Sequence, residues 1–193
     1  MSVRQSGVVL VRHGETEWSR AGRHTSRTDV PLTDGGRREA AGLAAPLAAR
    51  AFGLVLTSPM ARARDTCALA GSAAVAQVDD DLREWDYGDF EGRTTAEIRV
   101  AEPGWSLWSD GAPGGETPAA VAARADRVIA RIRAAGGEVL VFAHAHLLRV
   151  LAARWVGLTA SDGARLALAP ARISVLGYER ETAVIERWNS PAA

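Results

Sequence analysis

Residues 8–16 read VVLVRHGET, a short apolar run that ends in a group of polar and charged side chains. An uninterrupted apolar run such as Val8 to Val11 is typical of a strand covered on both faces of its sheet. Two similar runs follow, Leu54 to Leu56 (LVL) and Val139 to Ala143 (VLVFA), with helical patterns between them. This alternation predicts an α/β fold, a three-layer α/β/α sandwich with a mostly parallel sheet.

Apolar spacing and a capping residue predict the first helix. Thr33 or Asp34 can cap a helix whose apolar positions continue to Ala51. A proline lies within this pattern and cannot donate a backbone hydrogen bond. We therefore expect a kink or break between Gly42 and Pro46.

Two later helices are predicted to begin with proline. Ser58 offers an N-cap and Pro59 a first helical position for a helix that runs towards Leu69, and Thr117 and Pro118 do the same for a later helix. The other predicted elements are a short strand at 75–78, a short helix at 95–100, a buried helix at 147–155, and late strands at 173–176 and 184–188, the last of them antiparallel.

The composition excludes several classes of protein. All 23 basic side chains are arginines and they balance 23 acidic ones, so no overall field attracts nucleic acid or an anionic membrane. Apolar residues make up 47% of the chain and charged residues 24%, which is ordinary for a globular protein. The length suits a single domain over residues 1–193.

The chain lacks the usual features of a secreted or membrane-spanning protein. One cysteine, Cys67, leaves no internal disulfide framework. No apolar stretch reaches the roughly 18 residues of a membrane span, and residues 1–7 (MSVRQSG) are polar. We therefore expect a cytoplasmic protein, and either a monomer or a homodimer is compatible with the sequence.

Four basic side chains follow the three apolar runs. Arg12 and His13 come directly after the first run and His144 directly after the third. The second run continues into Thr57-Ser58-Pro59, and Arg62 follows one helical turn later. Because ligands of open α/β sheets bind beyond the carboxyl ends of the strands, we expect these side chains in one cleft. Arginine presents a planar fork of donors to anionic oxygens, so phosphate is the expected ligand.

The motifs around these residues resemble those of the histidine phosphatase superfamily, which includes cofactor-dependent phosphoglycerate mutases and many phosphatases. Arg12 to Thr16 (RHGET) matches the superfamily's signature, RHGE followed by Ser or Thr. Further matching blocks occur in the same order along nearly the whole chain: Leu32-Thr33, Thr57 to Arg62 (TSPMAR), Leu82 to Gly88 (LREWDYG), Gly115 to Thr117 (GET) and Phe142 to His144 (FAH). The resemblance implies a phosphoglycerate mutase-like fold.

The resemblance also implies catalytic roles. His13 would be the nucleophile that becomes phosphohistidine, and the neighbouring arginines would keep its imidazole neutral. Arg12, Arg62 and His144 would hold the phosphoryl oxygens. Glu84 would protonate the leaving group and later accept a proton from water, which predicts activity at mildly acidic pH. No metal ion or other cofactor is expected, because the arginines supply the positive charge.

Other motif residues are candidate contacts with the substrate: Ser19, Thr25, Ser26, Trp85, Tyr87 and Ala145. Three of them depart from the residues usual in the superfamily. Ser19 replaces a common Asn, Ser26 replaces a Gly, and Ala145 replaces the Gly that often follows the second histidine. Because serine is shorter than asparagine, the replacement at Ser19 is expected to leave the phosphate with fewer direct ligands.

The remaining histidines have plainer interpretations. His144 and His146 have the spacing of half a zinc site, but no third ligand follows at a suitable spacing, so no metal site is expected. His146 is expected to cap the following helix, and His24 to lie in a loop near the cleft. The arginines expected on the solvated surface are Arg64, Arg124, Arg127 and Arg131.

The resemblance also separates a phosphatase from a mutase. Mutases carry an arginine directly after the general acid, where this chain has Trp85, and a basic stretch where residues 104–115 (GWSLWSDGAPGG) hold no basic residue. We therefore expect a phosphatase that acts on a small phosphorylated metabolite and releases inorganic phosphate. The alternatives are a cofactor-dependent phosphoglycerate mutase and a phospho-ligand-binding protein without turnover.

The block from Asp79 to Gly92, with Trp105 and Trp108, is most similar to one phosphatase branch. That branch contains small actinobacterial acid phosphatases and a fungal sedoheptulose-bisphosphatase, whose substrates are sugar phosphates and other small phosphomonoesters. Trp85 and the two later tryptophans would form either an aromatic lid over a sugar or part of the core.

Overall fold

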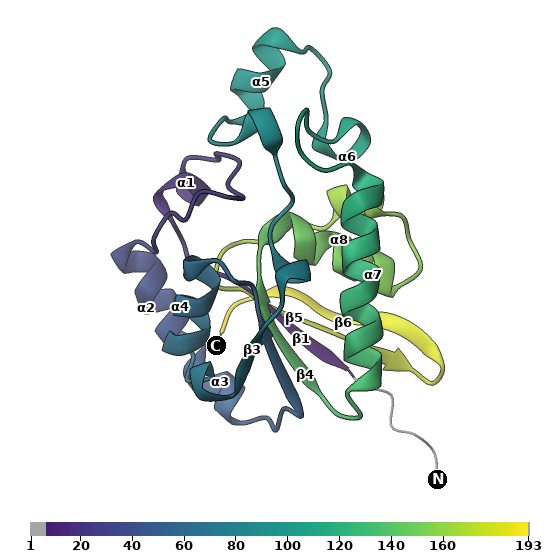
Figure 1. Ribbon diagram of the computed structural model, residues 1–193. Helices are drawn as coiled ribbons and strands as arrows, with labels where there is room; N and C mark the ends of the chain where they lie inside the picture. The colour runs from purple at the N-terminus through teal and green to yellow at the C-terminus, as the bar shows by residue number, and fades with distance from the viewer. Residues whose placement is uncertain (1–6, 193) are drawn as a thin grey trace.

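The computed structural model describes residues 7–192, which form a six-stranded sheet with helices on both faces (Figure 1). The strands are β1 (Val8–Arg12), β2 (Leu54–Thr57), β3 (Ala76–Val78), β4 (Val139–Ala143), β5 (Ile173–Glu179) and β6 (Thr182–Ser190). The α-helices are α1 (Glu17–Arg20), α2 (Asp34–Gly42), α3 (Ala44–Ala48), α4 (Ala61–Leu69), α5 (Thr95–Ala101), α6 (Leu107–Asp110), α7 (Pro118–Ala134) and α8 (Ala145–Trp155). Short 3₁₀ turns are η1 (Ala73–Val75), η2 (Asp80–Leu82), η3 (Gly88–Phe90) and η4 (Ala160–Arg165).

The sheet has the spatial order β3-β2-β4-β1-β5-β6. β1, β2, β3 and β4 pair in parallel, and β5 and β6 add an antiparallel hairpin beside β1. The mostly parallel sheet is therefore confirmed. The predicted pairing of the last strand is also confirmed, and β5 is antiparallel to its neighbours as well.

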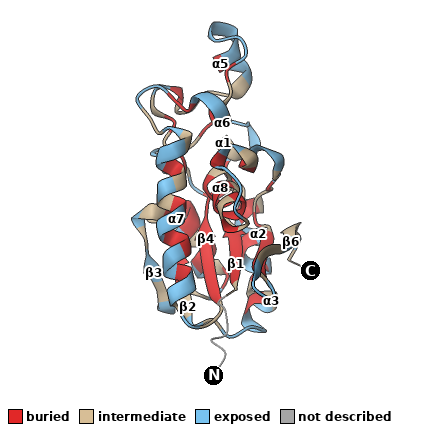
Figure 2. Cartoon of the chain, turned by 90° about the vertical axis from the view of Figure 1, so that its right-hand side faces the viewer, coloured by how far each residue is buried: buried red, intermediate tan, exposed pale blue. Residues whose placement is uncertain are grey.

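Alternate residues of β1 face two separate cores. Val8 and Leu10 pack on the side of α7 and α8, whereas Val9 and Val11 pack on the side of α3 and α4. In Figure 2 the buried residues lie in the sheet and on the inward sides of the helices. Because both faces of the strand are covered, its apolar run is continuous. The three-layer α/β/α sandwich is confirmed.

Two predicted helix boundaries are confirmed. The first predicted helix is divided between α2 and α3 at Leu43, inside the expected break. Thr117 caps α7, because its Oγ1 accepts a hydrogen bond from the N–H of Ala120 at 3.2 Å, and Pro118 is the first helical residue. The remaining predicted strands and short helices are present, with ends that differ by at most three residues.

The predicted start of α4 is wrong. The helix begins at Ala61, and Met60 rather than Ser58 occupies the N-cap position. Ser58 remains extended from the end of β2, where its N–H donates to the carbonyl of Phe142 at 2.9 Å. Its hydroxyl is thereby placed at the edge of the sheet from which the other site residues project.

The segments between the strands build a cap over the carboxyl ends of the parallel strands. In Figure 1, α1, α5 and α6 lie beyond these ends, at the top of the view. This arrangement encloses the region where a ligand of an α/β sheet is expected. Among the helices of residues 7–192, none is long and apolar enough to cross a membrane.

Candidate active site

A cavity of about 250 Å³ lies at the carboxyl ends of β1 and β4. Seven of the eleven candidate catalytic and substrate-contact residues line it: Arg12, His13, Ser19, Thr25, Glu84, Tyr87 and Ala145. His144 and Arg62 are fully buried, and the ring centroid of His144 is 5.2 Å from that of His13. The structure therefore gathers the residues from the three strand ends into one site.

His13 is held in one tautomer by the loop that follows β1. Its Nδ1 lies 2.7 Å from the carbonyl oxygen of Gly14, so we assign the proton to Nδ1 and the lone pair to Nε2. Burial lowers the pKa of His13 well below its usual value, and the cations of Arg12 and Arg62 lower it further. The imidazole is therefore neutral at pH 7, as nucleophilic attack requires.

Glycine allows this loop to pass close to α2. A Cβ on Gly14 would lie 2.4 Å from the carbonyl oxygen of Gly36, and a Cβ on Gly36 would lie 2.2 Å from that of Glu15. The N–H of Gly14 donates to Oγ1 of Thr66 at 3.0 Å, which connects the loop to α4. The loop that orients His13 is thus held between two helices.

Backbone carbonyls hold the two arginines. Arg12 donates through Nη1 to the carbonyl of Leu168 at 2.6 Å, and Arg62 donates to three carbonyls of residues 25–28 at 3.0–3.2 Å. Asp29 lies 3.8 Å from Arg62. Burial lowers the pKa of both guanidinium groups, yet a guanidinium remains charged in proteins. Two fixed cations therefore lie beside His13.

Three buried side-chain nitrogens of residues 7–192 have no hydrogen-bond partner: Arg12 Nε, Arg62 Nε and His144 Nδ1. An unpaired buried donor costs about 1–3 kcal/mol, and a charged one costs more. All three belong to residues that the resemblance assigns to phosphate binding. An oxyanion in the cavity offers the acceptors that the protein does not supply to them.

His144 makes a contact that the sequence analysis missed. Its Nε2 lies 2.7 Å from Oγ of Ser58. With the hydroxyl donating, Nε2 accepts and Nδ1 carries the proton. Burial, followed by the charge of Arg62, lowers the pKa of His144 well below its usual value. The position of Ser58 directly after the end of β2, where ligands of an α/β sheet bind, was the signal that could have identified it.

Glu84 lies in the loop between β3 and α5, against the N-terminus of α8. Its carboxylate accepts hydrogen bonds from the N–H groups of Trp85 and Leu147 at 2.9 Å and of His146 at 3.0 Å. The last two donors belong to the first turn of α8, where N–H groups lack partners within the helix. The candidate acid–base residue thus shares the cavity with His13.

Four of the six candidate substrate contacts line the cavity: Ser19, Thr25, Tyr87 and Ala145. The hydroxyls of two of them already donate within the protein. Ser19 Oγ donates to the carbonyl of Thr16 at 3.0 Å, and Thr25 Oγ1 donates to that of Arg23 at 3.0 Å. These two hydroxyls can therefore accept a hydrogen bond from a ligand, but they can donate one only after the hydroxyl rotates away from its carbonyl.

Ser26 and Trp85 do not line this cavity, contrary to the expectation. Ser26 Oγ donates to Glu91 Oε2 at 2.6 Å. Trp85 is fully buried, and its Nε1 donates to the carbonyl of Glu116 at 2.9 Å. Trp105 is only 5% exposed. These two tryptophans therefore belong to the core and form no lid.

Arg149, which no sequence motif singled out, also lines the cavity from α8. Its guanidinium carbon lies 4.4 Å from the ring centroid of the half-buried Trp108, and its Nε donates to the carbonyl of Gly163 at 3.0 Å. Arg149 follows His146 by three residues, a spacing that places two side chains on one face of a helix. That spacing could have identified it.

The two remaining histidines line the same cavity. His146 does not cap α8 as expected: it lies inside the first turn, and its Nδ1 is 2.7 Å from the hydroxyl of Tyr87. His24 lies in a loop, as expected, with Nε2 3.3 Å from Oγ1 of Thr95. Burial lowers the pKa of His24 to about 4 and that of His146 well below its usual value. Within residues 7–192, no three His, Cys, Asp or Glu side chains cluster as metal ligands.

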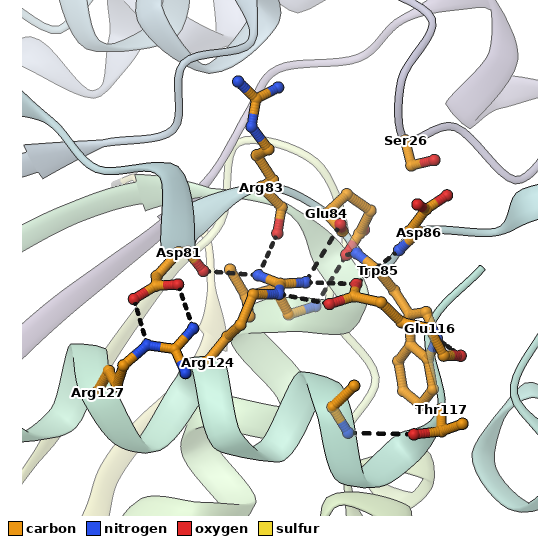
Figure 3. Close-up of polar contacts among 12 residues, drawn as sticks. Ser26, Asp81, Arg83, Glu84, Trp85, Asp86, Glu116, Thr117, Arg124 and Arg127 are labelled. Atoms are coloured by element: carbon orange, nitrogen blue, oxygen red, sulfur yellow. Dashed lines mark hydrogen bonds and ion pairs between the residues drawn. The ribbon is translucent and has the colours of Figure 1, made fainter.

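One of the arginines expected on the solvated surface lies elsewhere. Arg127 and Arg131 are exposed and form ion pairs with residues 79–81, as expected. Arg124 is only 13% exposed and is paired with Glu116 (Figure 3). The expectation for Arg124 is wrong, because its side chain turns inward to the loop that carries the acid–base candidate.

Residues 8–191 match the family described as the histidine phosphatase superfamily (branch 1). An acid phosphatase of Mycobacterium tuberculosis is 42% identical over 99% of this chain and 97% of its own length. A sedoheptulose 1,7-bisphosphatase of Saccharomyces cerevisiae is 37% identical over 78% of this chain and 67% of its own length. The predicted resemblance to this branch is confirmed.

Solved structures agree with this assignment. The product of an open reading frame of Mycobacterium tuberculosis superposes with a TM-score of 0.93 at 38% identity, covering 98% of this chain and all of that one. A mycobacterial glucosyl-3-phosphoglycerate phosphatase, solved with VO3, gives 0.85 at 30% identity over 96% of this chain and 99% of its own. The chain therefore belongs to the histidine phosphatase superfamily and is a phosphatase.

Proposed function

We propose that this phosphatase hydrolyses small phosphomonoesters, sugar phosphates among them, through a phosphohistidine on His13, with Glu84 as general acid and base and without a metal ion. The observation that carries the proposal is the set of unpaired buried nitrogens on Arg12, Arg62 and His144 near a neutral His13. Fixed cationic donors of this kind stabilise the charge of a transferring phosphoryl group. The names of the two relatives, an acid phosphatase and a sugar bisphosphatase, support this substrate class.

In the first step, the lone pair of His13 Nε2 forms a bond to phosphorus while the bond from phosphorus to the leaving oxygen breaks. The electron pair of the broken bond stays on the leaving oxygen, and Glu84 gives that oxygen a proton. Arg12, Arg62 and His144 donate to the phosphoryl oxygens, which carry the charge of the transition state. The products are an alcohol and phosphohistidine.

In the second step, water attacks the phosphorus of phosphohistidine and gives a proton to the Glu84 carboxylate. The bond between phosphorus and Nε2 breaks, and its electron pair returns to the imidazole of His13. The hydrogen bond from Nδ1 to Gly14 keeps the same nitrogen available in both steps. Inorganic phosphate leaves, and Glu84 is protonated again.

The mutase alternative finds no support at the residue that follows Glu84. A mutase places an arginine there to hold the carboxylate of the substrate, whereas Trp85 is buried and donates its indole N–H to Glu116. The basic stretch expected of a mutase is also missing from residues 104–115. Interconversion of phosphoglycerate isomers, primed by a bisphosphoglycerate, would establish the mutase instead.

Hydrolysis of 4-nitrophenyl phosphate and of sugar phosphates in excess EDTA tests the proposal. We expect full activity in EDTA and a loss of about a thousandfold or more for His13→Ala, because the nucleophile is removed. Arg127→Gln is the control, since it changes an exposed side chain outside the cavity and should retain activity. Activity that disappears in EDTA would contradict metal independence. Tight phosphate binding without turnover would indicate the phospho-ligand-binding alternative.

A further inference from the structure

We infer that Arg124, oriented by Glu116, is a positioning residue that holds the loop carrying Glu84 in its reactive place. The inference rests on the proposed acid–base role of Glu84 and extends the machinery to two side chains outside the catalytic cavity. Four observations support it: the irregular loop, the donors of Arg124, the orientation of its guanidinium, and the separate anchor of the Glu84 carboxylate.

The loop that carries Glu84 has no helix or strand of its own. Residues 83–87 lie between η2 and η3 and adopt no regular structure. Their backbone groups therefore find no partners in a helix or a sheet ladder, and buried backbone groups without partners are rare. Groups outside any helix or sheet ladder must therefore supply the missing contacts, and side chains of other elements are among them.

Arg124 supplies donors to this loop from α7 (Figure 3). Its Nη1 donates to the carbonyl oxygens of Asp81 at 2.6 Å and of Arg83 at 3.0 Å, and its Nη2 donates to that of Glu84 at 3.4 Å. One planar guanidinium thus contacts three carbonyls along four residues of the chain. A lysine, with a single nitrogen, could not reproduce this fork.

Glu116 fixes the orientation of that guanidinium. Its Oε1 accepts from Nε of Arg124 at 2.7 Å and its Oε2 accepts from Nη2 at 2.8 Å. Oε2 also accepts from the N–H of Asp86 at 2.9 Å, and the N–H of Glu116 donates to the carbonyl of Asp86 at 2.9 Å. The indole N–H of Trp85 donates to the carbonyl of Glu116. Each of residues 84–86 therefore contacts Arg124 or Glu116.

The carboxylate of Glu84 has a second, independent anchor on α8. The N–H groups of His146 and Leu147 donate to it, so α8 holds the side chain while Arg124 holds the backbone. Proton transfer requires the acid within hydrogen-bond reach of the leaving oxygen. A displacement of about 1 Å can cost about a hundredfold in rate. Loss of Arg124 should therefore impair the proton transfer and leave phosphate binding intact.

The dependence on the leaving group separates a positioning role from a structural one. An alkyl phosphate needs a proton on its leaving oxygen, whereas 2,4-dinitrophenolate leaves without one. The value of kcat/KM reports the steps up to the first release of alcohol, so it excludes the later hydrolysis of phosphohistidine. A variant that is only less stable loses activity on both substrates equally.

The experiment compares Arg124→Gln with Arg127→Gln, which removes an exposed arginine from the same helix. We expect Arg124→Gln to lower kcat/KM for glycerol 3-phosphate by about 10- to 100-fold and for 2,4-dinitrophenyl phosphate by less than about threefold. Arg127→Gln should leave both values unchanged. Equal losses on the two substrates, no loss on either, or the same pattern in Arg127→Gln would overturn the inference.

Glu84→Gln separates this inference from the proposed function. If Glu84→Gln shows no preference for the activated ester, the proposed acid role fails; if it does and Arg124→Gln does not, only the positioning role fails. Should Arg124→Gln not fold, Glu116→Gln replaces it, because glutamine still accepts from Asp86 but ends the ion pair. The same selective loss is expected, and an unselective one would overturn the inference.

Discussion

At the scale of single residues, the proposed chemistry depends on which nitrogen of His13 and of His144 carries the proton. His13 is bound through Nδ1 to the carbonyl of Gly14, and His144 is bound through Nε2 to the hydroxyl of Ser58. The two rings therefore leave opposite nitrogens free. Nε2 of His13 offers a lone pair for the proposed attack on phosphorus, and Nδ1 of His144 offers an N–H to a phosphoryl oxygen.

Ser58→Ala tests the hydrogen bond to His144. Removing the hydroxyl leaves Nε2 without its partner, and a hydrogen bond of this kind contributes about 1 kcal/mol, or several-fold to about tenfold in rate. We expect kcat/KM to fall by about five- to tenfold and the melting temperature to fall by about 2–4 °C. Thr57→Val, which removes the neighbouring buried hydroxyl, is the control and should keep the rate. Unchanged kinetics of Ser58→Ala would refute this role.

His24 links the stability of the protein to pH. Burial lowers its pKa from 6.5 to about 4, so the unfolded state binds the proton more readily between these values. The stabilisation from a neutral His24 is complete above pH 6.5 and is lost as the pH falls towards 4. We expect His24→Asn to reduce the difference in unfolding free energy between pH 6.5 and 5 by about 1.5 kcal/mol. Urea denaturation of both proteins at the two pH values measures the unfolding free energies. The same pH difference in the wild type and in His24→Asn would contradict this role of His24.

At the scale of elements, the approach of α2 to the loop after β1 decides where His13 lies. Glycine occupies both contact positions, and neither accommodates a Cβ without movement of the backbone. Gly36 and Gly42 lie in the same helix but in different surroundings. Nothing lies within 4 Å of a Cβ added at Gly42, whereas one at Gly36 meets the backbone of Glu15.

Alanine at these two glycines should therefore have opposite effects. Gly36→Ala should cost about 1–3 kcal/mol of stability through overpacking and lower activity, because the loop that orients His13 must move. Gly42→Ala should stabilise the protein by about 0.5–1 kcal/mol without affecting activity. Thermal unfolding and kcat/KM measure both effects. Native activity and stability in Gly36→Ala would show that the close approach does not matter.

The sequence predicts elements well where a single pattern controls them. The strands follow from apolar runs covered on both faces, and Thr117 with Pro118 marks the start of α7 correctly. The prediction of Ser58 as the N-cap of α4 was wrong because serine serves equally well as a helix cap and as a hydrogen-bond partner of a distant histidine, here His144. Arg124 could not be found, because its partners are backbone carbonyls of an irregular loop and leave no pattern in the side chains.

Glu84 shows the corresponding limit for the site. Without the family resemblance, the acidic run that contains it offers Asp86 as an equal candidate. The structure distinguishes the two, because Glu84 lines the cavity that contains His13 and Asp86 does not. The strand ends alone were enough to predict that Arg12, His13 and His144 lie in one site, because parallel strands bring their carboxyl ends together.

At the scale of the whole molecule, the zero net charge conceals an uneven distribution. The acidic segment 79–86 forms ion pairs with Arg27, Arg127 and Arg131. Arg12, by contrast, has no carboxylate within ion-pair distance among residues 7–192. Pairing elsewhere thus leaves positive charge concentrated at the cavity.

An oxyanion should therefore stabilise the folded protein. We expect inorganic phosphate or vanadate to raise the melting temperature, by the equivalent of about 2.7 kcal/mol at a hundred times its dissociation constant. Chloride at equal ionic strength should have little effect. Arg12→Gln should lose most of the phosphate shift, and Arg127→Gln should keep it. Equal shifts in phosphate and chloride would contradict a specific anion site.

Trapping the intermediate tests the central claim most directly. Glu84→Gln is mixed rapidly with 2,4-dinitrophenyl phosphate, quenched in alkali, in which phosphohistidine survives, and digested for mass spectrometry. Because the substituted side chain cannot accept a proton from water, the phosphorylated protein should accumulate. We predict one phosphoryl group, located on His13. Release of phosphate with no phosphorylated protein, or a phosphoryl group on another residue, would contradict the mechanism.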